Sequence, residues 1–473
     1  MHYPALMTDL YELTMLAGYF EDGMHEKPAS FDLFFRNVPY QGSYAVFAGL
    51  APALDYLKNL QFTEEELSYL QSLELFRPEF IDYLRGFRFH CKVTALAEGS
   101  VVFGSEPLLT VEGNLAEAQL AETALLNIIN FQTLIATKAA RINQAAGDGE
   151  VLEFGMRRAH GPDGALSVAR AAYIGGVRST SNVWAGQLNN IPVKGTHAHS
   201  WIMAFGDELK AFRAYADVFP DHTILLVDTY DTLKSGIPNA ITVARELRQK
   251  GHELIGIRLD SGDLSYLSRE ARRMFDEAGF PKVKIVASNE LDEFVIHSIR
   301  DEGGKVDIYG VGTNLATASG EGGGALGGVY KLVRFDGQPR LKITSDTTKA
   351  TLPDHKSLLR LVNEDGRFVQ DVICRAGETI QAGDIVYDPL NPARHKKVPE
   401  GVRCINLRRV VMDKGEIVGE LLDLPTCADH CAEQLKYLPE GSLRLYNPHT
   451  YKVSISAALQ ALREELVREY EVS

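Results

Sequence analysis

Residues 224–231, ILLVDTYD, and residues 254–263, LIGIRLDSGD, decide the fold, because each joins a short apolar run to a cluster of carboxylates. Similar runs begin at Val283 and Val306, so the four runs start 30, 29 and 23 residues apart. This is the pitch of strand–helix units, and uninterrupted apolar strands are typical of a parallel sheet covered on both faces. The spacing predicts an irregular β/α barrel within residues 116–330.

Helix signals fill the spaces between these runs. Residues 264–278 keep one apolar face, with Asp263 placed to cap the start of a helix and Gly279 placed to end it. Pro238 suits the first turn of another helix. Ligands of β/α barrels bind to the loops that follow the strands, so functional residues are expected there.

The two flanking segments have a different pattern. Residues 1–115 contain a predicted hairpin over residues 31–49 and an acidic helix over residues 63–72. Residues 331–473 are rich in short strands and end with a helix. We predict that both segments pack together as an α/β domain beside the barrel, so the predicted fold class is α/β.

The composition excludes several classes of protein. Apolar residues make up 45% of the chain and charged residues 24%, which is typical of a folded globular protein. Because 49 Lys and Arg stand against 63 Asp and Glu, the net charge is −14 and a nucleic-acid partner is not expected. Any phosphorylated ligand must be held by local donors.

Cysteine usage and the N-terminus favour a cytoplasmic location. The chain has five cysteines, an odd number, and no Lys or Arg before Lys27, so it lacks the basic start of a signal peptide. Residues 123–137 form the longest charge-free apolar-rich stretch and are too short to cross a membrane. The stretch CADHC at 427–431 has no second ligand pair, so it does not predict a zinc site.

A further apolar run, residues 151–154, is the first predicted strand, and polar and aromatic side chains end and follow it in residues 153–161, EFGMRRAHG. Arg157 and Arg158 follow Gly155 and offer bidentate donors for phosphate or carboxylate, while Phe154 can stack on an aromatic ring. The alternative is a surface arginine pair with salt bridges and a core phenylalanine.

Two histidines lie in residues 195–200, GTHAHS. On an extended chain His197 and His199 point to opposite faces, so they do not bind one metal together. Each is either a hydrogen-bonded structural residue or a single acting group, which means a general base or an acceptor of a phosphoryl group.

Carboxylates and glycines end the later strands. Asp228 and Asp260 lie at carboxyl ends of strands, where Mg²⁺ and sugar hydroxyls are usually held. Residues 303–328 contain ten glycines, and Gly310 and Gly312 directly follow a strand. Their backbone N–H groups predict a phosphate nest.

Together these loops resemble the nicotinate phosphoribosyltransferase family, in the type II phosphoribosyltransferase group. The resemblance covers nearly the whole chain and rests on several motifs in the family's order, which are more specific than any one alone. The motifs are TDLYELTM at 8–15, EFGMRR at 153–158, GTHAHS at 195–200, RLDSG at 258–262 and LYNPH at 445–449.

The resemblance implies an enzyme that joins nicotinate to 5-phosphoribosyl-1-pyrophosphate and forms nicotinate mononucleotide and pyrophosphate. The reaction is coupled to ATP hydrolysis and is the first step of NAD synthesis from nicotinate. The resemblance also implies Mg²⁺, and a cytoplasmic homodimer with shared active sites. It assigns no residue as a metal ligand.

The resemblance also implies roles for single residues. By motif, His199 is the residue that ATP phosphorylates transiently. Phe154 and Arg157 would embrace the pyridine ring, and Tyr11 from the opposite subunit would stack on the ring's other face. Arg258 would hold the nicotinate end.

Further roles concern the ribose and the phosphates. Asp260 would lie on the ribosyl or ring side, where a carboxylate stabilises the oxocarbenium charge of the transition state. Gly310 and Gly312, with Thr313 beside them, would form the nest for the 5-phosphate. Arg36 would reach ATP or pyrophosphate across the dimer.

The choice of pyridine substrate depends on residues 178–182, RSTSN. This stretch offers hydroxyl, amide and guanidinium groups and no carboxylate, which favours nicotinate over nicotinamide. We therefore predict substrate contacts from Ser181 and Asn182. The alternative is a capped turn before the next helix.

Two other functions are alternatives to this one. A nicotinamide-using or quinolinate-using relative has the same fold, but quinolinate transferases are shorter, use no ATP and need a second carboxylate pocket. A catalytically silent barrel that binds a nucleotide as a regulator would not need His199, Asp260 and Arg157.

Overall fold

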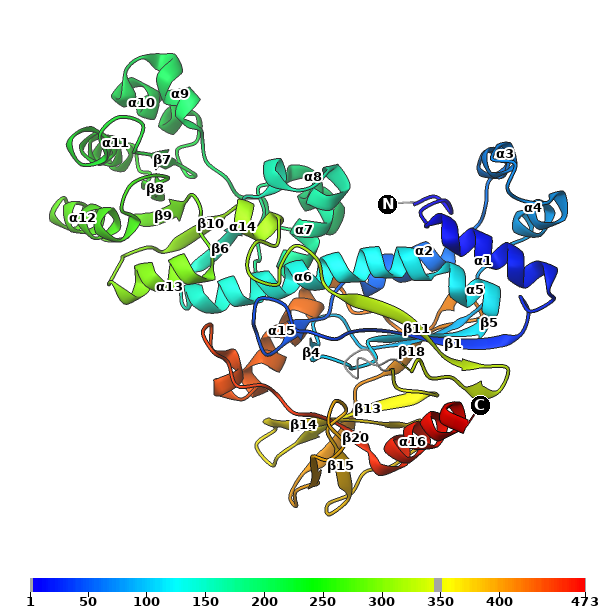
Figure 1. The fold of residues 1–473 in the computed structure, drawn as a ribbon. Coiled ribbons are helices and arrows are strands. Elements are labelled where there is room, and N and C mark those ends of the chain that lie inside the picture. The colour runs from blue at the N-terminus through cyan, green and yellow to red at the C-terminus, as the bar shows by residue number, and fades with distance from the viewer. Residues whose placement is uncertain (1–2, 344–350, 473) are drawn as a thin grey trace. The chain divides into compact units, whose positions relative to one another are not determined.

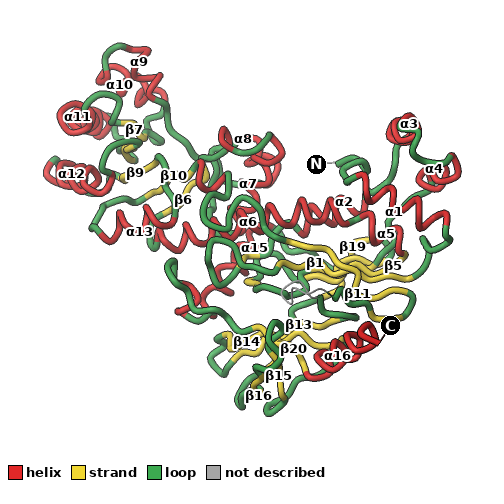
Figure 2. Tube along the Cα trace, in the orientation of Figure 1, coloured by secondary structure: helices red, strands yellow, loops and turns green. Residues whose placement is uncertain are grey.

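The computed structural model describes residues 3–343 and 351–472 (Figure 1). The chain divides into two compact units, residues 135–320 and residues 1–134 with 321–473. Both units contain helices and strands (Figure 2), so the mixed α/β class that the sequence predicts is confirmed.

The unit 135–320 is built on a five-stranded sheet whose strands all pair in parallel. The strands, in sheet order, are β6 (Glu150–Glu153), β10 (Ile308–Val311), β9 (Lys284–Ser288), β8 (Gly256–Leu259) and β7 (Ile224–Leu226). Each overlaps one of the apolar runs, so the repeat of strand–helix units is confirmed. Because the strands are parallel, their carboxyl ends share one edge of the sheet.

The sheet continues beyond β6 through single-residue parallel bridges, from Glu153 to Thr180 and from Thr180 to Val193. Among residues 3–343 and 351–472, no strand pairing joins Val193 to β7. Instead Nε2 of His197 accepts a hydrogen bond from the backbone N–H of Leu226 at 3.2 Å. The parallel sheet is therefore consistent with the wall of a barrel, but a closed barrel is not shown. In a closed barrel a backbone carbonyl would accept from the N–H of Leu226, whereas here the His197 side chain accepts from it.

Helices cover one face of this sheet, and their ends follow the sequence signals. Asp263 caps α12 (Leu264–Glu277) by accepting from the N–H of Tyr266 at 2.9 Å, and Gly279 follows with a φ of 84°. Pro238 lies in the first turn of α11 (Ile237–Gln249). The other helices of the unit are α7 (Pro162–Ile174), α8 (Val183–Asn189), α9 (His199–Phe205), α10 (Glu208–Val218), α13 (Glu293–Asp301) and α14 (Thr313–Ala316).

Alternation along the strands sends two rows of side chains to opposite faces of the sheet. Ile257, Leu259 and Ile285 belong to the core shared with α10, α11 and α12. Leu152, Val286 and Ile308 form a separate apolar cluster. Two residues further along each strand, this second row continues at the carboxyl edge with Phe154, Ser288 and Gly310. The alternation therefore places Phe154 and Ser288 next to the apolar cluster of Leu152, Val286 and Ile308, on the same face of the sheet.

The other unit contains a seven-stranded sheet that draws strands from both ends of the chain. In sheet order these are β12 (Gln338–Pro339), β11 (Gly328–Phe335), β1 (Pro28–Phe35), β5 (Leu109–Asn114), β3 (Lys92–Ala95), β18 (Arg409–Asp413) and β19 (Glu416–Ile417). The hairpin predicted over residues 31–49 is wrong, because β1 pairs with β5 and β11. Seven of its eight residues are buried, so this strand lies inside a sheet and has neighbours at both edges.

A six-stranded sheet and a two-stranded sheet complete this unit. Their strands are β16 (His395–Lys397), β15 (Ile385–Tyr387), β20 (Val453–Ser456), β14 (Phe368–Arg375), β13 (Lys356–Val362), β17 (Arg403–Asn406), β2 (Ala45–Val46) and β4 (Val101–Val102). The helices are α1 (Leu10–Glu21), α2 (Leu50–Lys58), α3 (Glu64–Ser72), α4 (Pro78–Arg85), α5 (Leu115–Leu120), α15 (Leu424–Tyr437) and α16 (Ala457–Val472), and α6 (Glu122–Ala146) begins here. Within residues 3–343 and 351–472, no helix has the length and apolar character needed to span a bilayer.

Candidate active site

A cavity of about 470 Å³ lies at the carboxyl edge of the parallel sheet. Its lining comes from the loops after β6, β8, β9 and β10 and from residues near the two bridges. Eight predicted site residues meet here: Phe154, Arg157, Ser181, Arg258, Asp260, Gly310, Gly312 and Thr313. The remaining lining residues are Met156, Arg158, Gly195, Thr196, Ser288, Asn289 and Glu290.

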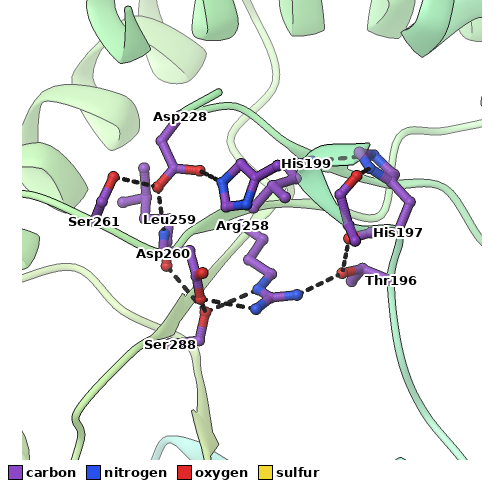
Figure 3. Close-up of polar contacts among 11 residues, drawn as sticks. Thr196, His197, His199, Asp228, Arg258, Leu259, Asp260, Ser261 and Ser288 are labelled. Carbon is purple, nitrogen blue, oxygen red and sulfur yellow. Dashed lines mark hydrogen bonds and ion pairs between the residues drawn. The ribbon is translucent and has the colours of Figure 1, made fainter. Parts of the chain in front are cut away.

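Arg258 is fixed by three side chains (Figure 3). It donates from Nη2 to Oδ1 of Asp260 and from Nε to Oγ of Ser288, both at 2.8 Å. It also donates from Nη1 to Oγ1 of Thr196 at 3.2 Å. Its guanidinium carbon lies 5.6 Å from the centre of the Phe154 ring. The cation is therefore held in one position beside the aromatic wall of the cavity.

Asp260 is an ionised carboxylate in this environment. Burial acts to raise its pKa, but the hydrogen bond from Ser288 and the charge of Arg258 outweigh burial and hold the pKa of Asp260 below its ordinary value. These two partners both engage Oδ1. Among the described residues Oδ2 accepts no hydrogen bond, so it is available to a ligand in the cavity.

His199 and Asp228 form a hydrogen-bonded pair, with Nε2 and Oδ1 3.2 Å apart. The Asp228 side chain is 1% exposed, whereas that of His199 is 39% exposed. A carboxylate can only accept, so Nε2 donates and the neutral imidazole keeps its lone pair on Nδ1. Oδ2 of Asp228 accepts from the N–H of Asp260 at 2.8 Å and from Oγ of Ser261 at 2.6 Å. One buried carboxylate thus connects the accessible histidine to the Asp260 loop.

His197 has the opposite character. It is 8% exposed, and its ring contacts Tyr215 edge to face, with ring centres 4.8 Å apart. Burial lowers the pKa of His197 to about 4, so the imidazole is neutral and can accept from the N–H of Leu226. The interpretation of a structural, hydrogen-bonded histidine is confirmed for His197, which leaves His199 as the residue able to act.

This burial predicts a pH dependence of stability. The pKa of His197 is about 4 when folded, against 6.5 for an ordinary histidine, so the unfolded chain binds more protons between these values. The contribution of His197 to the free energy of unfolding is complete above the pKa of the unfolded chain and is lost as the pH falls toward the folded pKa. We expect His197 to remove about 2 kcal/mol of unfolding free energy between about pH 7.5 and about pH 5.

Urea unfolding at both pH values measures this loss. The variant His197→Gln keeps an acceptor for the Leu226 N–H and cannot titrate, so its unfolding free energy should fall less than that of the wild type over the same interval. Equal losses in both proteins would contradict the assignment.

Gly310, which lies within β10 and not after the strand as the sequence predicts, and Gly312, just after β10, make room for Phe154. A Cβ added to Gly310 would lie 2.7 Å from the Phe154 ring, and one added to Gly312 would lie 3.2 Å from the Phe154 carbonyl oxygen. Thr313 follows at the start of α14. Close packing against the aromatic wall is therefore one physical reason for glycine here, beside the predicted phosphate nest.

The structure places Asn182 and Ser181 in different environments. Asn182 is completely buried and caps α8, accepting from the N–H of Ala185 at 3.1 Å. The alternative of a capped turn is thus confirmed for Asn182, which does not line the cavity. Ser181 does line it.

Tyr11 and Arg36 belong to the other unit. Tyr11, on α1, lines a cavity of about 350 Å³, and partial burial raises its pKa to about 12, so its phenol is neutral. Arg36 lines a cavity of about 620 Å³ together with three further basic side chains, Arg394, Lys396 and Lys452. Neither residue lies in the unit 135–320, which carries the cavity lined by Arg258 and Asp260.

Several residues that line or support the cavity have no role predicted from the sequence. The sequence predicts Asp228 only as a strand-end carboxylate and predicts no role for Ser288, although Ser288 also ends a strand. Asn289 and Glu290 follow Ser288 with φ values of 85° and 46°. Nδ2 of Asn314 holds this turn by donating to the carbonyls of Glu290 and Leu291, at 3.2 and 3.1 Å. The expectation that functional residues lie at the carboxyl ends of parallel strands predicts Asp260, and it applies equally to Ser288.

The fold and the site define an α/β protein with a cavity at the carboxyl edge of a parallel sheet, lined by arginine and carboxylate side chains. Comparison with known protein families identifies the family to which the chain belongs. Residues 6–130 match the nicotinate phosphoribosyltransferase (NAPRTase) N-terminal domain, residues 150–367 match the nicotinate phosphoribosyltransferase (NAPRTase) family, and residues 355–463 match its C-terminal domain.

Full-length relatives agree with these matches. The nicotinate phosphoribosyltransferase of Bacillus subtilis (strain 168) is 45% identical, over 96% of this chain and 93% of that protein. The human enzyme of that name is 35% identical, over 98% of this chain and 96% of its own length. The chain therefore belongs to the nicotinate phosphoribosyltransferase family, and it is an enzyme with that activity in NAD biosynthesis.

Solved structures agree in fold. The crystal structure of human nicotinic acid phosphoribosyltransferase superposes with a TM-score of 0.86 at 34% identity, covering 97% of this chain and 99% of that one. A nicotinate-nucleotide pyrophosphorylase from Pyrococcus furiosus superposes with a TM-score of 0.71 at 26% identity, covering 92% and 95%.

Proposed function

We propose that the enzyme transfers the 5-phosphoribosyl group of 5-phosphoribosyl-1-pyrophosphate to nicotinate, and couples this transfer to ATP hydrolysis through phosphorylated His199. The observation that carries the proposal is the carboxylate of Asp228. It holds Nε2 of His199 with one oxygen and the backbone of Asp260 with the other. A change at the histidine therefore reaches the residue proposed for the transfer step.

In the transfer, the nitrogen of the pyridine ring attacks the anomeric carbon. The new C–N bond forms as the C–O bond to pyrophosphate breaks, and positive charge develops on the ribose in between. The ionised carboxylate of Asp260 stabilises that charge, because its pKa is held low and one of its oxygens accepts no bond from the described protein. The ring nitrogen already has a lone pair, so no general base is needed.

The pyridine side of the cavity is proposed to hold nicotinate by its ring and its carboxylate. Phe154 would stack on the ring, with Arg157 beside it and Tyr11 of the opposite subunit on the other face. Arg258 and Ser181 would bind the carboxylate end, and Asn182 would fix Ser181 by capping α8. Gly312 and Thr313 would hold the 5-phosphate with backbone and hydroxyl donors.

The ATP step is proposed to place a phosphoryl group on Nδ1 of His199. The N–P bond forms as the P–O bond to ADP breaks, and the charge left on the ring is balanced by Asp228. The phosphoryl group adds negative charge beside the cavity and biases the order of its loops until hydrolysis removes it.

Mg²⁺ is compatible with the donors of this cavity, which include carboxylate oxygens from Asp260 and Glu290. Glu290 would contribute one ligand and the substrate's phosphates the others, because the described residues contain no group of three or more His, Cys, Asp or Glu side chains able to hold a metal ion. When bound, Mg²⁺ neutralises charge on phosphate oxygens.

The proposed assembly is a cytoplasmic homodimer with shared sites, in which Tyr11 and Arg36 reach the partner's cavity. Its support is the basic cavity around Arg36 and the exposed apolar residues of α8, where Val183 is 70% and Leu188 57% exposed. We also propose that the parallel sheet is the wall of an irregular β/α barrel, which the bridges through Thr180 and the His197–Leu226 hydrogen bond support.

Pyrophosphate release with different pyridines tests the proposed reaction. We expect release with nicotinate, stimulation by ATP, and at least about a hundredfold lower kcat/KM with nicotinamide, because a buried site loses that much when a charged partner is left unpaired. Quinolinate should also be a poor substrate. Equal rates with nicotinamide, or release that ATP does not change, would contradict the proposal.

A further inference from the structure

Glu153 ends β6 and is buried beneath the cavity, with 1% of its surface exposed. Both oxygens of its carboxylate are occupied. Oε1 accepts from the N–H of Gly155, and Oε2 accepts from Oγ1 of Thr180 at 2.5 Å. Burial raises the pKa of Glu153, while these two hydrogen bonds oppose the rise. The proposed chemistry gives this buried acid no role.

Backbone hydrogen bonds join the same two segments. The N–H of Glu153 donates to the carbonyl of Ser179 at 3.0 Å, and the N–H of Ser181 donates to the carbonyl of Glu153 at 2.9 Å. Thr180 Oγ1 also accepts from the N–H of Asn182 at 2.9 Å. The loop that carries Ser181 is therefore held to the end of β6 by both its backbone and its side chains.

Thr180 extends the connection to a third segment. Its N–H donates to the carbonyl of Pro192 at 3.1 Å, and its carbonyl accepts from the N–H of Lys194 at 3.0 Å. That segment leads directly into Gly195 and Thr196, which line the cavity. The Glu153–Thr180 contact thus lies where three loops of the cavity meet.

The turn at Gly155 has little freedom to adjust. A Cβ at this position would lie 2.4 Å from Cβ of Ala316 and 2.9 Å from the carbonyl oxygen of Gly312. The turn is packed against the glycine segment on one side and hydrogen-bonded to Glu153 on the other. Phe154 and Arg157 flank this turn, so its position determines where the aromatic wall and the arginine lie.

We propose that Glu153 is a positioning residue that sets the spacing between Phe154 and Arg157 on one loop and Ser181 on another, and so determines affinity for the pyridine substrate. This inference rests on the proposed roles of those three residues. Removing either partner leaves a buried donor or acceptor unpaired, which moves the loops. A displacement of about 1 Å at a site can lower catalytic efficiency about a hundredfold.

Three variants test the hydrogen bond itself. Thr180→Val removes the hydroxyl and keeps the shape, Thr180→Ser keeps the hydroxyl, and Glu153→Gln replaces one acceptor oxygen by a donor. With ATP saturating, we expect Thr180→Val and Glu153→Gln to raise the KM for nicotinate about 10- to 100-fold, and the KM for 5-phosphoribosyl-1-pyrophosphate by less than about threefold. Thr180→Ser should restore a value close to that of the wild type.

A matched control separates positioning from stability. Glu208 is another buried acid of the same unit, 5% exposed, which accepts from Ser235 and from Asn239 at 2.8 Å and does not line the cavity. Glu208→Gln should lower the Tm to a similar extent and leave the KM for nicotinate unchanged. The double variant Glu153→Gln with Thr180→Val should raise the KM for nicotinate no further than Thr180→Val alone, because the Glu153–Thr180 contact is already absent in that single variant.

An unchanged KM in folded Thr180→Val would overturn the inference, as would an equal rise in Glu208→Gln. Arg157→Ala tests the underlying assignment separately. If Arg157→Ala leaves the KM for nicotinate unchanged, then the proposed pyridine side is wrong. If Arg157→Ala raises the KM and Thr180→Val does not, then only the role of Glu153 fails.

Discussion

Replacement of Asp260 by asparagine is expected to lower kcat by about 10²- to 10³-fold, which is the size of effect seen when one electrostatic contact to a transition state is lost. The asparagine side chain is as large as aspartate and can still accept hydrogen bonds from Arg258 and Ser288. It cannot supply the negative charge that stabilises the ribosyl cation. Single-turnover measurement of pyrophosphate release shows the loss directly, because it isolates bond breaking from product release.

Asp263→Asn is the matched control for this experiment. It makes the same change three residues along the same loop, where the side chain caps α12 and lies outside the cavity lining. Asparagine is as good a cap as aspartate, so both kcat and Tm should stay close to those of the wild type. A folded Asp260→Asn enzyme that turns over at the rate of the control would show that this carboxylate does not act in the transfer.

Replacement of His199 by alanine is expected to abolish stimulation by ATP and to leave weak transferase activity that ATP does not change. The imidazole is the only acceptor proposed for the phosphoryl group, so without it ATP hydrolysis cannot be coupled to the transfer reaction. Coupling between sites is typically about 1 to 3 kcal/mol, so kcat/KM in the presence of ATP should fall about 5- to 150-fold. Parallel assays of pyrophosphate and ADP release, each with and without ATP, measure both effects.

A second readout distinguishes phosphorylation from general damage to the site. Incubation with radiolabelled ATP should give acid-labile label on the wild type and none on His199→Ala. His222→Ala, which removes an exposed histidine of the same unit outside the cavity lining, should label like the wild type. Full stimulation by ATP in His199→Ala, or label that persists there, would refute the phosphohistidine.

The strands and their helices could be predicted from the sequence because the signals are local. Apolar runs at a regular spacing overlap every strand of the parallel sheet, and Asp263 and Pro238 lie at the helix starts that their chemistry favours. Asp260 could be found for the same reason, since a carboxylate at the end of a parallel strand lies at the edge where ligands bind.

Contacts between distant segments could not be predicted in the same way. His199 and Asp228 are 29 residues apart, and nothing local shows that the carboxylate accepts a hydrogen bond from the imidazole. The wrong hairpin at residues 31–49 has the same cause, because the partners of β1 come from residues 109–114 and 328–335. Asn182 suits both a substrate contact and a helix cap, and only its complete burial identifies the cap.

By itself, the sequence determined which residue types stand at the strand ends, because the periodicity of apolar side chains and the chemistry of caps act over a few neighbours. Only the tertiary structure decided which of two histidines is accessible and which acid lies beside it. Burial, hydrogen-bond distance and pKa depend on side chains that meet across the sheet. His197 and His199 are two residues apart in the chain, yet one is enclosed by α10 and the other reaches the Asp228 carboxylate.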